Sequence, residues 1–102
     1  MPGYRILYHP LVRSRDIPRL DPPLRRRIRA AIESKLTKHP EDIAKPLAYT
    51  TRRLWSLRVG DWRVIFALRE NEVWILRIGH RRDVDAARSY PNPPGDDLVS
   101  EP

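Results

Sequence analysis

The stretch SLRVGDWRVIF, residues 56–66, decides how the sheet of this chain is built. Gly60-Asp61 is typical of a two-residue turn between antiparallel strands. Counting outward from this turn places Arg58 directly opposite Arg63 on the neighbouring strand. Like charges that face each other across an antiparallel pair destabilise a sheet by up to about 1 kcal/mol. The two arginines therefore need an explanation other than sheet stability.

Two explanations of the arginine pair are open at this point. A guanidinium group binds phosphate through two parallel hydrogen bonds and stays charged at every physiological pH, so a phosphate bound between Arg58 and Arg63 turns the repulsion into attraction. Alternatively, the two groups point apart into water, or pair with Asp61 and an acidic residue of the C-terminal region. We expect the first arrangement, a phosphate-binding face.

The same register divides the hairpin into an apolar face and a basic face. The basic face carries Ser56, Arg58, Arg63 and Ile65. The apolar face, which we expect to pack against a helix, carries Trp55, Leu57, Val59, Trp62, Val64 and Phe66.

The position of the third strand depends on the length of its turn. We expect a three-residue connection, residues 70–72, which pairs Arg69 with Val73 and Arg63 with Gly79. A two-residue turn reverses the faces, because side chains alternate along a strand. The three-residue connection buries the larger apolar set. It sends Trp74, Leu76 and Ile78 into the core and Arg77 to the basic face.

The rest of the chain predicts two helical segments before the sheet and one after it. Tyr4–His9 alternates as a first strand, and Pro10 opens a short helical segment that Pro18 kinks or stops. Asp21 is suited to cap the next helix, in which apolar residues recur at every fourth position until His39-Pro40 ends it. The remaining predicted segments are a loop over residues 41–51, strands over 53–59, 62–69 and 73–79, and one or two helical turns within 83–90.

The order β-α-α-β-β-β-α predicts an α+β fold, with two N-terminal helices packed on one face of a mostly antiparallel sheet. We expect one domain over residues 1–90. The tail PNPPGDDLVSEP, residues 91–102, holds four prolines and three acidic residues, and we expect it to be disordered.

Composition and charge narrow the classes of function. All 20 basic residues and ten of the 13 acidic residues lie in residues 1–90, which therefore carry a net charge of +10. Such an excess favours an anionic partner such as nucleic acid. The chain has no cysteine, and its three histidines are widely spaced, so we expect neither a metal site nor a cofactor. We find no signal sequence or apolar span and expect a cytoplasmic protein without membrane contact.

Two motifs in this region are informative through both their residues and their separation. They are RVGDWRVIF, at residues 58–66, and IGHRRDV, at residues 78–84. Together with DIPRLDPPLRRRIRAAIESKL upstream, they make residues 4–85 resemble the RelE/ParE superfamily of bacterial toxin–antitoxin toxins, closer to RelE. The resemblance implies the compact RelE-like fold, which is also called microbial-ribonuclease-like. It also implies one of two activities: RelE-like members cut messenger RNA in the ribosomal A site, and ParE-like members poison DNA gyrase.

The resemblance also implies roles for individual residues. Arg63 and Arg81 match the arginines that stabilise the phosphate during cleavage. His80 and Tyr90 are candidates for proton transfer. The chain departs from the RelE pattern at Leu54 and Ser56, where lysines are usual, and at Asp85, where a tyrosine is common. The candidates for binding substrate phosphate are Arg53, Arg58, Arg77 and Arg82.

The function expected from these observations is that of a ribosome-dependent endoribonuclease toxin, and the alternative is a gyrase inhibitor without catalysis. The expected partners are a cognate antitoxin, the ribosome with its messenger RNA, and operator DNA only through the antitoxin. The antitoxin segment is expected to be acidic and aliphatic, and to fold as it binds.

Overall fold

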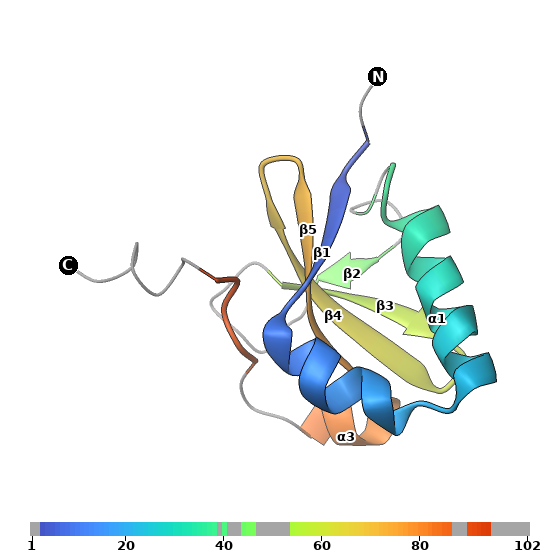
Figure 1. Cartoon of the computed structure of the whole chain (residues 1–102). Helices are drawn as coiled ribbons and strands as arrows, with labels where there is room; N and C mark the ends of the chain where they lie inside the picture. The colour runs from blue at the N-terminus through green and yellow to red at the C-terminus, as the bar shows by residue number, and fades with distance from the viewer. Residues whose placement is uncertain (1–2, 39, 41–43, 47–53, 87–89, 95–102) are drawn as a thin grey trace.

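A computed structural model describes residues 3–38, 40, 44–46, 54–86 and 90–94 of the chain. Its elements follow a mixed order of strands and helices (Figure 1). They are β1 (Arg5–Tyr8), the π-helical turn η1 (Val12–Asp16), the 3-10 turn η2 (Ile17–Arg19), α1 (Pro22–Lys35), β2 (Lys45–Pro46), β3 (Leu54–Val59), β4 (Trp62–Arg69), β5 (Glu72–His80) and α3 (Arg81–Ala86). Within the described part of the chain, no helix has the length and apolarity to cross a bilayer.

The strands form one sheet in the order β1-β5-β4-β3-β2. β1 runs parallel to β5, and every other neighbouring pair is antiparallel. The predicted α+β class with a mostly antiparallel sheet is thus confirmed. Residues 45–46, which we expected to lie in a loop, instead form the short edge strand β2 beside β3.

The helix α1 begins where the sequence indicated. The Asp21 carboxylate accepts a hydrogen bond from the backbone N–H of Leu24 at 3.1 Å, which satisfies one of the free amides of the first turn. Ile28 and Ile32, on the apolar stripe, are buried against the sheet. The regular helix ends at Lys35, earlier than the predicted end at His39-Pro40.

The first helical segment differs from an ordinary α-helix. The N–H of Ile17 donates to the carbonyl of Val12, which is π-type spacing, and a 3-10 turn with Pro18 follows. Proline has no N–H to donate, so the segment cannot continue as regular helix. Its residues nevertheless share one core with α1. This main core consists of buried Val12, Leu20, Ile28, Ile32, Leu36, Ala44, Leu57, Val59, Val64, Phe66, Val73, Ile75 and Ile78.

The carboxylate of Asp16 connects this N-terminal segment to the middle of the sheet. It is 2% exposed, and its Oδ2 accepts a hydrogen bond of 2.9 Å from the N–H of Ile78 in β5. β1 pairs with β5 only as far as Ile75, so this N–H lies beyond the end of β1 and needs another acceptor. Asp16 supplies that acceptor.

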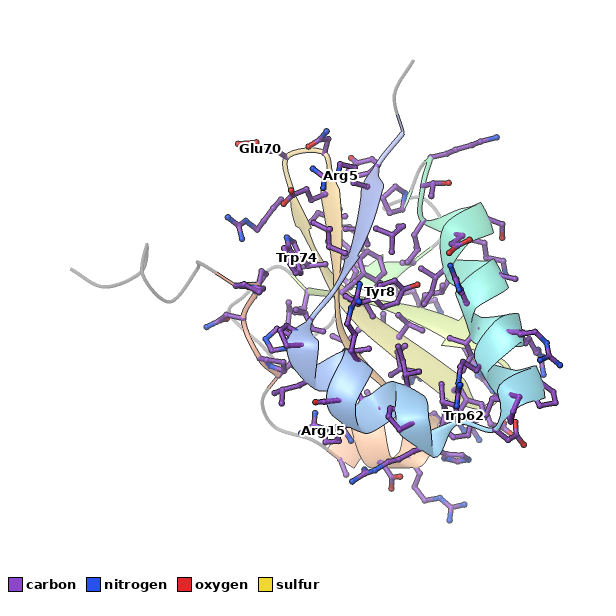
Figure 2. All side chains as sticks on the ribbon, in the orientation of Figure 1. Arg5, Tyr8, Arg15, Trp62, Glu70 and Trp74 are labelled. Atoms are coloured by element: carbon purple, nitrogen blue, oxygen red, sulfur yellow. The ribbon has the colours of Figure 1, made fainter. Side chains whose placement is uncertain are left out.

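The register of β5 confirms half of the expectation and contradicts the other half. Arg63 pairs with Gly79, as expected, but Arg69 pairs with Glu72 rather than Val73. The turn has two residues, with Glu70 at a positive φ of 51°, and it lies at the opposite end of the sheet from Trp62 (Figure 2). A β-bulge between Ile65 and Phe66 absorbs the one-residue difference.

The bulge changes which side chains reach the main core. Ile78 lies in it, as predicted. The prediction for Trp74 and Leu76 is wrong, because both lie on the opposite face, and Val73 and Ile75 take their places.

That opposite face is therefore not an open basic surface. Most of it is a second small apolar cluster of Leu54, Ile65, Ala67, Leu76 and Val84, against which Trp74 and Tyr90 pack. Val84 comes from α3, which begins at Arg81, two residues before the predicted range of 83–90; residues 87–89 of that range lie outside the described residues. The basic residues of this face, Arg58, Arg63 and Arg77, lie toward the end of the sheet beside α3, away from the turn at Glu70 (Figure 1).

The predicted tail is described only over residues 91–94, and the part from residue 95 on lies outside the described residues. In the described part, Pro93 is buried and the carbonyl of Pro94 accepts a hydrogen bond of 3.1 Å from Arg69 Nη1.

Candidate functional site

Three arginines gather around the turn between β3 and β4. Gly60 adopts a φ of 61°, which the hairpin turn requires and glycine adopts without strain. Arg58 Nε donates to the Gly60 carbonyl at 2.8 Å, and the backbone N–H of Arg81 donates to the Asp61 carbonyl at 2.8 Å. From α1, Arg27 Nη2 lies 3.2 Å from where a Cβ on Gly60 would stand.

Arg63 is held from two sides. Its Nη1 donates to Ser56 Oγ on β3 at 3.2 Å, and its Nε lies 2.9 Å from Asp85 Oδ1 on α3. The Nε atom is buried and makes no hydrogen bond with the described residues, so the contact with Asp85 is an ion pair in which this N–H does not point at the carboxylate. The Arg63 side chain is 26% exposed and that of Asp85 is 53% exposed.

These contacts resolve the repulsion between the opposed arginines. Arg58 pairs with Arg63 in the ladder, as predicted. Their guanidinium groups have separate partners: Arg58 donates to the Gly60 carbonyl, whereas Arg63 donates to Ser56 Oγ and forms an ion pair with Asp85. The expectation that the pair needs a bound phosphate is therefore corrected: the chain supplies the anion itself.

Arg77 and Tyr90 extend this site on the same face. Arg77 pairs with Ile65, and its Nε is buried without a hydrogen-bond partner among the described residues. The Tyr90 hydroxyl donates to the Val84 carbonyl at 2.9 Å. Burial raises the pKa of Tyr90, and the nearby Asp85 raises it further, against the opposing effect of the arginines. Tyr90 therefore keeps its proton at neutral pH.

His80 lies apart from Arg63. It pairs with Trp62 across the ladder, and the two rings meet edge to face with centroids 5.6 Å apart. Trp62 packs on the main core, so His80 is on that side of the sheet, opposite the arginine site. Its Nδ1 accepts a hydrogen bond of 3.2 Å from the N–H of Arg82, whose side chain is exposed. Arg53 lies outside the described residues.

Sequence reasoning missed Asp85, Ser56 and Arg27 as parts of this site. Ser56 was placed on the basic face without a role, Asp85 was noted only as a departure from a family pattern, and Arg27 was not singled out. The available signal was the opposed arginine pair, which requires an acceptor nearby. In the described ranges, no three histidine, aspartate or glutamate side chains are grouped to hold a metal ion. The arrangement suits the binding of an oxyanion by fixed guanidinium groups.

Comparisons with known proteins fit this architecture. The chain aligns over 78% of its length with 99% of a chain in the crystal structure of the toxin–antitoxin complex RelBE2 from Mycobacterium tuberculosis, with a TM-score of 0.70 and 26% sequence identity. A search of curated proteins finds no significant match. Residues 6–85 match the family model described as the ParE toxin of type II toxin–antitoxin systems, parDE. The predicted RelE/ParE membership is thus confirmed: the chain belongs to the ParE toxin family.

Proposed function

We propose that this toxin cleaves messenger RNA in the ribosomal A site, by attack of an RNA 2′-hydroxyl on the adjacent phosphodiester. The observation that supports the proposal is the gathering of Arg58, Arg63, Arg77 and Arg81 at one end of the sheet, where two buried guanidinium Nε atoms make no hydrogen bond with the described residues. A phosphorane bears extra negative charge on its equatorial oxygens as the 2′-oxygen bonds to phosphorus. Fixed positive groups stabilise that charge most where water is excluded.

The reaction needs two proton transfers besides charge stabilisation. A base takes the proton of the 2′-hydroxyl, and an acid gives a proton to the 5′-oxygen as its bond to phosphorus breaks. The Tyr90 hydroxyl, which stays protonated at neutral pH, suits the acid role once its bond to the Val84 carbonyl is released. Asp85 is the carboxylate beside Arg63, and His80 would have to act from the other side of the sheet.

The test uses translating ribosomes programmed with a defined message, followed by primer extension to map new 5′ ends. Purified wild type is compared with Arg63→Ala and Arg81→Ala. The matched control is Lys35→Ala, which removes one exposed positive charge from the far end of α1. We expect cleavage within the A-site codon for wild type and control, and loss of about 10²-fold or more for Arg63→Ala. Intact message with active wild-type toxin would rule the proposal out.

A second candidate is inhibition of DNA gyrase without catalysis. The family model that matches residues 6–85 describes ParE toxins, which favours it. The ion pair of Arg63 with Asp85 and the bond of Tyr90 to Val84 also leave no free acid–base pair beside the arginines among the described residues. A gyrase supercoiling assay separates the two: inhibition that survives Arg63→Ala, with intact message on ribosomes, establishes this alternative.

Both candidates include a cognate antitoxin as partner. The similar structure from Mycobacterium tuberculosis is a complex of toxin and antitoxin. For this chain we propose an acidic and aliphatic antitoxin segment, because the described surface of α1 exposes Arg25, Arg26, Arg27 and Arg29. Contact with operator DNA would then run through the antitoxin. A toxin that acts on ribosomes or gyrase works in the cytoplasm.

A further inference from the structure

The position of Asp85 follows from a close contact between α3 and β5. Val84 is fully buried in the second apolar cluster. A Cβ on Gly79 would lie only 2.9 Å from Val84 Cγ2, so α3 sits as near to the strand as a glycine there permits. Gly79 is the ladder partner of Arg63, and the residue after Val84 is Asp85. The chain thus fixes a carboxylate over Arg63.

Arg63 is the anchored member of this pair and Asp85 the exposed one. The guanidinium is tied to Ser56 and is half as exposed as the carboxylate, at 26% against 53%. Exposed ion pairs contribute little net stability, because water solvates the separated charges nearly as well. An incoming anion can therefore displace Asp85 at low cost without moving Arg63.

The arginine donors around Asp85 are not satisfied by it. Arg63 Nε and Arg77 Nε are both buried and make no hydrogen bond with the described residues. A buried donor without an acceptor is unfavourable. A phosphate offers more oxygens than one carboxylate, in directions that a side chain fixed to α3 cannot reach. The site is thus built for a larger oxyanion than the one that occupies it.

We propose that Asp85 is an intramolecular competitor, whose carboxylate occupies the place on Arg63, beside Arg77, that a phosphate of a nucleic acid takes. Asp85 then lowers the affinity of the free toxin for RNA and is displaced when RNA binds. The identity of the ligand as RNA rests on the proposed function. The competition itself concerns phosphate binding and does not depend on cleavage.

The experiment measures binding of the full chain to a fluorescein-labelled, mixed-sequence single-stranded RNA decamer by fluorescence anisotropy at fixed salt. Asp85→Asn is compared with wild type and with Asp83→Asn, which removes an equal charge from an exposed position of the same helix. We expect Asp85→Asn to tighten binding about three- to tenfold beyond Asp83→Asn, as loss of a competing exposed ion pair predicts. The excess should vanish when Arg63→Ala is also present.

Equal gains from the two aspartate variants would overturn the proposal, because net charge alone would then explain them. A gain that persists with Arg63→Ala, or weaker binding by Asp85→Asn, would overturn it as well. The result is separable from the proposed function. If the message stays intact on ribosomes while Asp85→Asn still tightens RNA binding through Arg63, competition stands and the cleavage proposal fails.

Discussion

Replacing Gly79 by alanine tests whether the close approach of α3 to β5 holds the site together. The new Cβ would lie 2.9 Å from Val84 Cγ2, whereas carbon atoms in good contact are about 3.5–4.0 Å apart. A valine side chain is stiff about χ1 and cannot readily turn away. The helix must therefore move outward by several tenths of an ångström or more, which takes Asp85 away from Arg63.

The magnitude follows from two opposing effects. Overpacking a buried contact costs about 1–3 kcal/mol. Alanine in place of glycine in a strand recovers about 0.5–1 kcal/mol, because the unfolded chain loses freedom. We expect Gly79→Ala to lower the free energy of unfolding by about 1–2 kcal/mol. Val84→Ala alone should cost about 1.6 kcal/mol for two buried methyl-sized groups, with more if a cavity remains.

The double variant makes the test specific. Without Val84 Cγ2, the alanine Cβ at residue 79 meets no such obstacle, so Gly79→Ala should cost almost nothing in the Val84→Ala background. We expect a favourable coupling of about 1 kcal/mol or more between the two substitutions. The assay is urea unfolding followed by tryptophan fluorescence with linear extrapolation. Costs that add within about 0.5 kcal/mol would refute the close-contact reasoning.

Three further predictions concern other parts of the molecule. Asp16→Ala should cost about 1–3 kcal/mol, because it leaves the Ile78 N–H buried without its acceptor, and Asp16→Asn, which keeps an oxygen there, should cost clearly less in urea unfolding. Asp21→Ala should cost about 0.5–2 kcal/mol in thermal unfolding and Asp21→Ser much less, since serine also caps; equal losses would contradict the capping role. Burial raises the pKa of Tyr8 and Tyr90, so the folded state holds their protons longer than the unfolded state. Their contribution to the free energy of unfolding should be fully present below pH 10 and should be lost as the pH rises through the raised pKa values of the folded state. A flat profile in this range, compared with the two Tyr→Phe variants, would contradict the prediction.

Local signals predicted the parts of the fold that depend on neighbouring residues. Gly60-Asp61 predicted the β3–β4 register because glycine adopts without strain the positive φ that a two-residue hairpin turn needs. Asp21 predicted the start of α1 because its side chain reaches the first turn of the same helix.

The β4–β5 register depends on the position of a β-bulge and not on the turn residues alone. Residues 73–76, VWIL, are apolar on both faces, so the pattern does not mark where the bulge shifts the alternation of side chains. The sequence predicted the pairing of β4 with β5 correctly at Gly79, far from the turn, but not at Glu72, next to the turn.

The candidate site was predictable as a set of arginines but not as a set of contacts. Arg58, Arg63 and Arg77 share a face because of the strand period. The partnership of Arg63 with Asp85 depends on how closely a helix packs, and the separation of His80 from Arg63 depends on its pairing with Trp62. No local sequence pattern predicts either the contact of Arg63 with Asp85 or the separation of His80 from Arg63.

The pairing of β1 with β5 also sets when the sheet can be completed during synthesis. The bond from Asp16 to Ile78 joins residues 62 positions apart, and β1 pairs with no other described strand. Arg5 of β1 pairs with Glu72, so at a synthesis rate of about 5–20 residues per second the first strand waits roughly 3–13 s for its partner. Such long-range pairing forms slowly compared with local structure. The arginine site is assembled only when α3 follows β5, so a nascent chain passes most of its synthesis without the contact between Arg63 and Asp85.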